Sequence, residues 1–209
     1  MKFTAILTTI LLLLLASSAL TMPMYFDVYA HDMSGSSHLG MISAYTGNID
    51  AASNYDYYSA SGHPINGPSP DDYISKMWMY YGSDGLAFNV IHNRDEGGGN
   101  YWNHVEWDLN FLNVGYNVLL QDDDPENQGE EGFLEISPGY MYADFAYIRN
   151  TDGGVIGLDY EGCNWSILVA PISVGDIQKI GFASGNGDWI TGWESPTPLP
   201  DGLGPGDQY

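Results

Sequence analysis

Short apolar and aromatic segments alternate with turn residues along the chain from Lys76 to Trp193. No long stretch shows helical periodicity, and the separators (SDG, NRDEGGGN, TDGG, EGCN and SGNGD) consist of residues that accept positive φ or cap turns. Strands at this spacing predict an all-β fold, either a two-sheet β-sandwich or a jelly roll. The expected strands are residues 24–30, 76–82, 86–92, 104–112, 116–121, 133–136, 140–149, 154–160, 165–172, 177–184 and 189–193.

The section 31–75 differs from the rest of the chain because it is rich in Ser, Tyr, Gly and Asn and has little periodicity. We expect long N-terminal surface loops here, with up to two short strands. Residues 196–209 are rich in Pro and Gly and lack apolar anchors, so we expect a flexible tail. A single β-sandwich domain is therefore predicted over 20–195.

The N-terminal segment has the composition of a secretory signal. One positive charge precedes an apolar run from Ala5 to Leu15, and the small residues Ser17 and Ala19 are spaced as a cleavage site requires. The run is shorter than the ~20 residues that span a bilayer. We interpret 1–19 as a signal peptide and expect the protein to be secreted or to lie at the cell surface. Cys163 is the only cysteine, so no disulfide forms within one chain.

Charge narrows the classes of partner. The 209-residue chain has 5 basic and 27 acidic residues, a formal net charge of −22. No basic patch is available for phosphate backbones or anionic lipid headgroups, so nucleic acid and anionic membranes are not expected partners. Unpaired carboxylates repel one another unless cations, salt or low pH intervene, which favours divalent ions or a saline setting.

Residues 104–112 (HVEWDLNFL) form the clearest amphipathic strand. Alternation places its apolar side chains on one face and four polar ones on the other: His104, Glu106, Asp108 and Asn110. Adjacent members of such a row are ~7 Å apart, which suits a pair of metal ligands or, less well, the two carboxylates of a glycoside hydrolase. The alternative is the solvated face of an antiparallel strand. For a hydrolase, Glu106 would pair with Asp108 or Glu135.

The stretch QDDDPENQGEEGFLE (121–135) contains seven carboxylates and no basic residue. Counted from Asp124, Gly129 and Glu135 occupy the sixth and twelfth positions of an EF-hand loop. Both flanks are strand-like, however, and Pro138 opposes a following helix, so an EF-hand is not expected. A calcium site on a β-loop needs only several oxygens at ~2.3–2.6 Å, and a solvated loop is the alternative.

Three segments, SDGLAFNVIHN, VEWD and IGFASGNGDWITGWES, taken in order, resemble the legume-type (L-type, concanavalin-like) lectin sandwich. The resemblance covers about a quarter of the chain. It implies a concanavalin-like fold, carbohydrate binding, a sugar contact from Asp84, and calcium plus a transition metal held by Glu106 and Asp108. No histidine follows His104, so calcium is the metal that we expect, held with help from Asp122, Asp123 and Asp124.

These observations favour a secreted, non-catalytic protein that binds carbohydrate or another extracellular surface with the help of calcium. Aromatic residues available for ligand binding include Trp102 and Trp189. The main alternative is a self-assembling structural subunit of an extracellular filament, sheath or coat, in which the strand around Tyr25–Ala30 adds to a neighbouring sheet. A glycoside hydrolase is a third, minor alternative.

Overall fold

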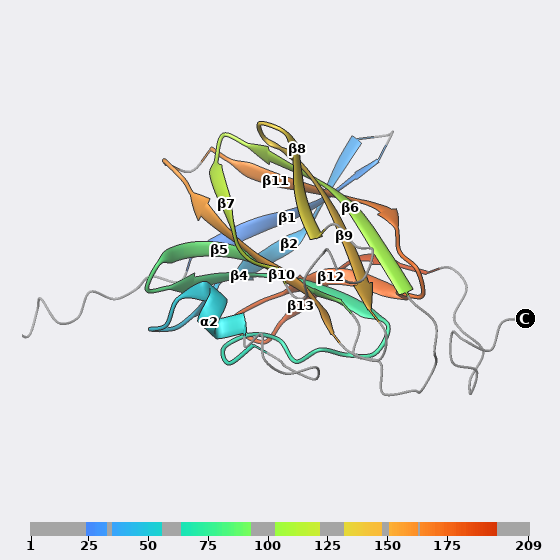
Figure 1. The fold of residues 1–209 in the computed structure, drawn as a ribbon, viewed down its shortest axis with the longest axis horizontal. Coiled ribbons are helices and arrows are strands. Elements are labelled where there is room, and N and C mark those ends of the chain that lie inside the picture. Colours follow the sequence, from blue (N-terminus) through green and yellow to red (C-terminus); the bar gives the residue numbers. More distant parts are fainter. Residues whose placement is uncertain are drawn as a thin grey trace, which may run out of the picture.

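The computed structural model describes residues 24–32, 35–55, 64–92, 103–121, 132–147, 151–162 and 164–195. It confirms the all-β prediction, because antiparallel sheets pack together as a sandwich, with one short helix on the outside (Figure 1). Among the described residues, no helix has the length and apolar character needed to cross a membrane.

Two sheets form the body of the sandwich. The seven-stranded sheet has the spatial order β13 (Trp189–Glu194), β12 (Lys179–Ala183), β4 (Ile74–Gly82), β5 (Gly85–His92), β10 (Asp152–Asp159) and β7 (Gly115–Gln121), with β3 (Tyr45–Thr46) beside β4. The four-stranded sheet has the order β11 (Ser166–Ser173), β6 (Asn103–Leu112), β9 (Tyr140–Tyr147) and β8 (Gly132–Ser137). Neighbours are antiparallel, except that β12 and β3 run parallel to β4.

The main core lies between the two sheets. Strand β6 shows how the sequence builds it, because Val105, Trp107 and Leu109 are almost fully buried while the residues between them are only half-buried. Neighbouring strands contribute the same alternation, with Met141, Ala143 and Phe145 of β9 facing inward. Burial of these side chains is the main free-energy source of the fold.

A second, smaller apolar cluster covers the other side of the seven-stranded sheet. Helix α2 (Ala51–Tyr55) packs Ala51 and Tyr55 against Trp78 and Tyr80 of β4. Strand β4 is therefore buried on both faces, which explains why its sequence, ISKMWMYYG, is a nearly continuous apolar run and shows no alternation.

Strands β1 (Tyr25–Asp32) and β2 (Gly35–Ser43) form a separate two-stranded hairpin. Its base closes one side of the sandwich: Val28 and Ile42 join the main core, and Phe26 contacts Trp165, with ring centroids 5.7 Å apart. The N-terminal strand thus pairs within its own chain.

The section 31–75 contains more regular structure than its composition indicates. It includes the nine-residue strand β2, the short β3 and helix α2. Strand β2 has no clear alternation because its first five residues, Gly35–Leu39, are all exposed, so no face of that half is selected for apolar side chains. The strand is held by pairing with β1, which runs from Asp32 and Gly35 to Tyr25 and Ser43 with a one-residue register shift between Val28 and Tyr29.

Candidate functional site

The outer face of the four-stranded sheet collects the polar side chains of β6 and β9. Glu106 and Asp108 lie on this face, as the alternation of β6 predicts, and Tyr140, Tyr142 and Asp144 of β9 lie beside them. In the register of the two strands, Glu106 is opposite Asp144, and Asp108 is opposite Tyr142. Glu135 lies elsewhere: its position in β8 is opposite the inward-facing Met141.

Polar pairs on this face connect β6 and β9 diagonally. The Tyr142 phenol donates to Glu106 Oε2 over 2.9 Å, and the Tyr140 phenol donates to Asp108 Oδ1 in a short hydrogen bond. His104 Nδ1 lies 3.3 Å from Asp144 Oδ1. Each contact joins a β6 residue to the β9 residue two positions away from its direct partner, a diagonal that long side chains can span. We call Glu106, Asp108, Tyr140 and Tyr142 the tyrosine–carboxylate row.

Each carboxylate of the row keeps one oxygen for another donor. The phenols occupy one oxygen of Glu106 and one of Asp108, and the second oxygen of each accepts no hydrogen bond from the described part of the chain. The hydrogen bond to Asp108 raises the pKa of the Tyr140 phenol, with burial adding to the effect. Tyr140 therefore remains a neutral donor at physiological pH.

Exposed aliphatic side chains surround the row. Leu168 of β11 is opposite Asn110, and Leu134 of β8 is opposite Tyr142; these side chains are 41% and 42% exposed. Leu112 and Ile172 at the ends of β6 and β11 are also exposed. Single exposed apolar residues are common, but several around one polar row make a surface with both apolar and hydrogen-bonding character, which is typical of binding sites.

The predicted calcium ligands are only partly placed. Glu106 and Asp108 share one face, whereas Asp122, Asp123 and Asp124 lie outside the described residues. Within the described ranges, no group of three or more His, Cys, Asp or Glu side chains is arranged to hold a metal ion. Glu106 and Asp108 therefore do not form a calcium site with their described neighbours, and calcium binding stays a prediction that depends on the 122–124 segment.

Asp84 is far from the tyrosine–carboxylate row. It lies in the turn between β4 and β5, and its carboxylate accepts hydrogen bonds from the Ala51 backbone N–H at 3.0 and 3.2 Å. Helix α2, which starts at Ala51, covers the side of the seven-stranded sheet that faces away from the core. The contact supplies an acceptor to a free N–H at the start of this helix, so in this arrangement Asp84 has a structural role.

Trp189 belongs to the seven-stranded sheet. Its ring packs directly over Gly181, where an added Cβ would approach the ring within 2.4 Å. The Lys76 ammonium lies 5.8 Å from the ring centroid, and the indole N–H donates to Thr191 Oγ1 over 3.0 Å. Trp102 lies outside the described residues. The structure thus places Asp84 and Trp189 on the seven-stranded sheet and Glu106 with Asp108 on the four-stranded one.

No protein-family model, curated protein or solved structure matches this chain. The resemblance to legume-type lectins therefore stays a prediction.

Sequence reasoning missed the two tyrosines of the row. The segment YMYADFAY alternates, which places Tyr140, Tyr142 and Asp144 on one face, but nothing in the sequence identifies β6 as the neighbouring strand. It also missed a buried pair: Ser75 Oγ and His92 Nδ1 are 2.8 Å apart, and neither side chain is exposed. A hydroxyl beside an imidazole can act as a nucleophile with its base, but full burial keeps this pair from a substrate.

Proposed function

We propose that the protein is an extracellular, non-catalytic binding protein that holds carbohydrate on the outer face of its four-stranded sheet. The observation that carries this proposal is the tyrosine–carboxylate row, in which two phenols fix two carboxylates side by side on the outer face of the four-stranded sheet. Side chains on a regular sheet, fixed by cross-strand hydrogen bonds, are preorganised for a ligand.

The chemistry of the row suits a neutral, hydroxyl-rich ligand. The second oxygens of Glu106 and Asp108 accept hydrogen bonds from sugar hydroxyls, and the two tyrosine rings offer apolar surface to the C–H faces of a sugar. A net charge of −22 disfavours anionic ligands such as phosphorylated or sulfated glycans. Neutral oligosaccharides are therefore the ligand class that we expect.

The test begins with a glycan array and continues with calorimetric titration of the tightest-binding neutral oligosaccharide. Replacing Tyr142 by Ala removes both the ring and the phenol that orients Glu106, and should weaken binding about tenfold or more. Glu106→Gln should also weaken it, because it replaces one accepting oxygen by a donor. An array without binders would overturn the proposal.

Trp189→Ala is the matched control, because it removes a partly exposed aromatic side chain from the other sheet. We expect this variant to bind sugar as the unchanged protein does, and both variants to retain their β-sheet circular dichroism. Sugar binding that is lost in Trp189→Ala and retained in Tyr142→Ala would place the site elsewhere and contradict our assignment.

Calcium assistance is a separate part of the proposal and rests on the expected contribution of Asp122, Asp123 and Asp124. It predicts that calcium raises the melting temperature more than magnesium at equal ionic strength, and that Asp108→Asn removes the difference. Equal effects of the two ions would reject a specific calcium site and leave sugar binding by the row untouched.

A further inference from the structure

The chain enters β11 through Asn164-Trp165-Ser166, the one Asn-x-Ser/Thr sequence that it contains. An asparagine in this sequence accepts N-linked oligosaccharides in exported proteins, provided that the middle residue is not proline. Because so short a sequence also occurs by chance, the accessibility of its asparagine and hydroxyl decides whether it can carry a glycan.

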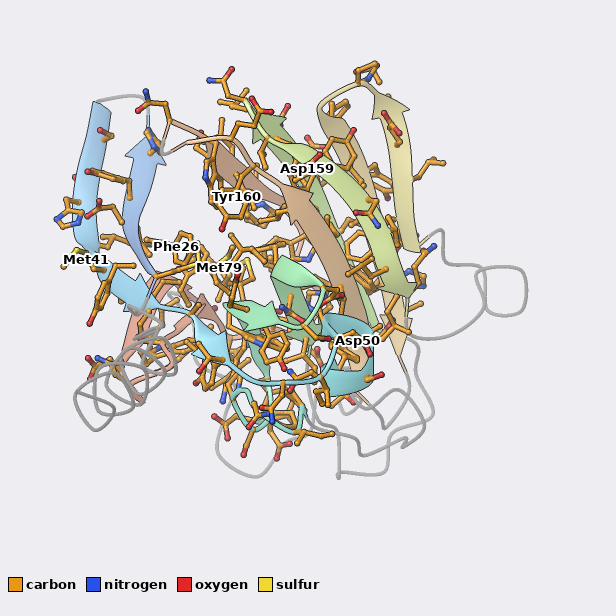
Figure 2. The ribbon with its side chains drawn as sticks, turned by 90° about the vertical axis from the view of Figure 1, so that its left-hand side faces the viewer. Phe26, Met41, Asp50, Met79, Asp159 and Tyr160 are labelled. Atoms are coloured by element: carbon orange, nitrogen blue, oxygen red, sulfur yellow. The ribbon has the colours of Figure 1, made fainter. Side chains whose placement is uncertain are left out.

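Exposed and partly buried side chains alternate from Asn164 into β11. Asn164 and Ser166 are exposed, whereas Trp165 between them is partly buried against the main core. The Trp165 ring centroid lies 5.7 Å from that of Phe26 and 6.0 Å from that of Tyr160. Figure 2 shows Phe26 and Tyr160 between the β1–β2 hairpin and the sheets. Because Trp165 anchors the middle of the sequence to the body, the side chains on either side of it face solvent.

The Asn164 side chain has no competing partner among the described residues. The Asn113 side-chain amide donates to the Asn164 carbonyl over 3.2 Å, a contact that holds the Asn164 backbone and leaves its own side-chain amide free. The turn is also open, because Gly162 has nothing within 4 Å of an added Cβ. An amide that is exposed, free and surrounded by space can carry a bulky, solvated group without disturbing the packing.

We propose that Asn164 is an N-glycosylation site. During export, the Asn164 side-chain nitrogen attacks C1 of an oligosaccharide that is carried on a lipid pyrophosphate. A bond forms between C1 and the nitrogen, the nitrogen loses one proton, and the bond from C1 to the pyrophosphate oxygen breaks. The lipid pyrophosphate leaves with the electron pair of that bond. This modification requires the export expected from residues 1–19 and does not depend on sugar binding.

The attachment point is separate from the tyrosine–carboxylate row. Ser166 is opposite Leu112 at the end of β6, whereas Ala170 is opposite Asp108. At about 3.3 Å per residue, Asn164 is about 20 Å along β11 from the level of Asp108. Removal of the glycan should therefore leave sugar binding by the row unchanged.

Mass spectrometry of the full chain exported by its native cells tests the proposal. We expect the mass of one oligosaccharide in addition to that of the polypeptide, and fragmentation should place it on Asn164. An exported protein with the mass of the polypeptide alone overturns the proposal and leaves sugar binding unaffected. A chain that stays in the cell unmodified overturns it together with the extracellular location.

Variants produced in a glycosylating secretory host test the role of each residue in the sequence. Asn164→Gln and Ser166→Ala should each abolish the added mass, whereas Ser166→Thr should keep it, because threonine also supplies the hydroxyl. Asn186→Gln is the matched control and should keep the added mass, since Asn186 is an exposed turn asparagine outside any such sequence. Added mass that persists in Asn164→Gln, or that disappears in Ser166→Thr, contradicts the assignment.

Discussion

At the scale of single residues, His92 shows how the fold uses a polar side chain within its core. It is fully buried at the end of β5, with its ring centroid 4.7 Å from that of Phe145 and 5.5 Å from that of Trp107. Its Nδ1 pairs with Ser75, whereas its Nε2 has no hydrogen-bond partner among the described residues. Burial lowers the pKa of His92 from 6.5 to about 3, so the imidazole is neutral in the folded protein.

This burial predicts a loss of stability in mild acid. The unfolded chain binds a proton at His92 below pH 6.5, whereas the folded chain does so only near pH 3. The free energy of unfolding is therefore unaffected by His92 above pH 6.5 and decreases as the pH falls from 6.5 toward 3. At about pH 5 the expected loss is about 2 kcal/mol. Urea unfolding at about pH 7.5 and about pH 5 measures it. His92→Gln keeps a polar partner for Ser75 but cannot titrate, so its stability should change less between these pH values. An equal change in both proteins would contradict the assignment.

At the scale of elements, positive-φ glycines fix the ends of several strands. Gly132, at the start of β8, has φ of 58°, and an added Cβ would lie 1.8 Å from Gln121 Oε1. That oxygen accepts the Phe133 N–H over 2.7 Å and thereby ties the end of β7 to the start of β8. The two sheets meet at this side of the sandwich, so the tie helps to set their relative position.

Gly132→Ala should therefore lower the free energy of unfolding by more than the strain of the left-handed conformation alone would. The conformation costs about 1 kcal/mol, and displacement of Gln121 from the Phe133 N–H adds about 1 kcal/mol more. Gly162→Ala is the matched control, because Gly162 has φ of 74° but nothing within 4 Å of its added Cβ. Urea unfolding midpoints of the two variants give the difference. If Gly162→Ala costs as much as Gly132→Ala, the Gln121 contact contributes nothing.

The same scale shows what the sequence can and cannot predict. Strands with one solvated face, such as β6, are evident from alternation, because one face packs against the core and the other faces water. Strand β2 is not evident from the sequence, because both faces of its first half are exposed and need no alternation of apolar and polar residues. The polar half of the site, Glu106 and Asp108, was predictable for the same reason as β6. Its tyrosines were not, because alternation places them on a face but does not determine which strand lies next to β9.

At the scale of the whole molecule, the excess of acidic over basic residues is the main electrostatic influence on stability. The chain has 27 acidic and 5 basic residues, and two of its lysines are already used in ion pairs, Lys76 with Asp71 and Lys179 with Glu194. With 27 acidic and 5 basic residues, most carboxylates have no basic side chain with which to pair. Exposed pairs contribute little to stability, so in this protein the repulsion among unpaired carboxylates should outweigh the attraction of the few pairs.

Added salt should therefore stabilise the fold. Screening shortens the range of repulsion to about 10 Å at about 0.1 M and about 3 Å at about 1 M. We expect the melting temperature to rise by at least about 3 °C between low salt and about 1 M NaCl, which corresponds to about 1 kcal/mol. The same titration near pH 4 is the control, because many carboxylates are neutral there while the general effect of salt on apolar burial persists. A salt effect of equal size at both pH values would show that apolar burial, not carboxylate repulsion, is what salt changes.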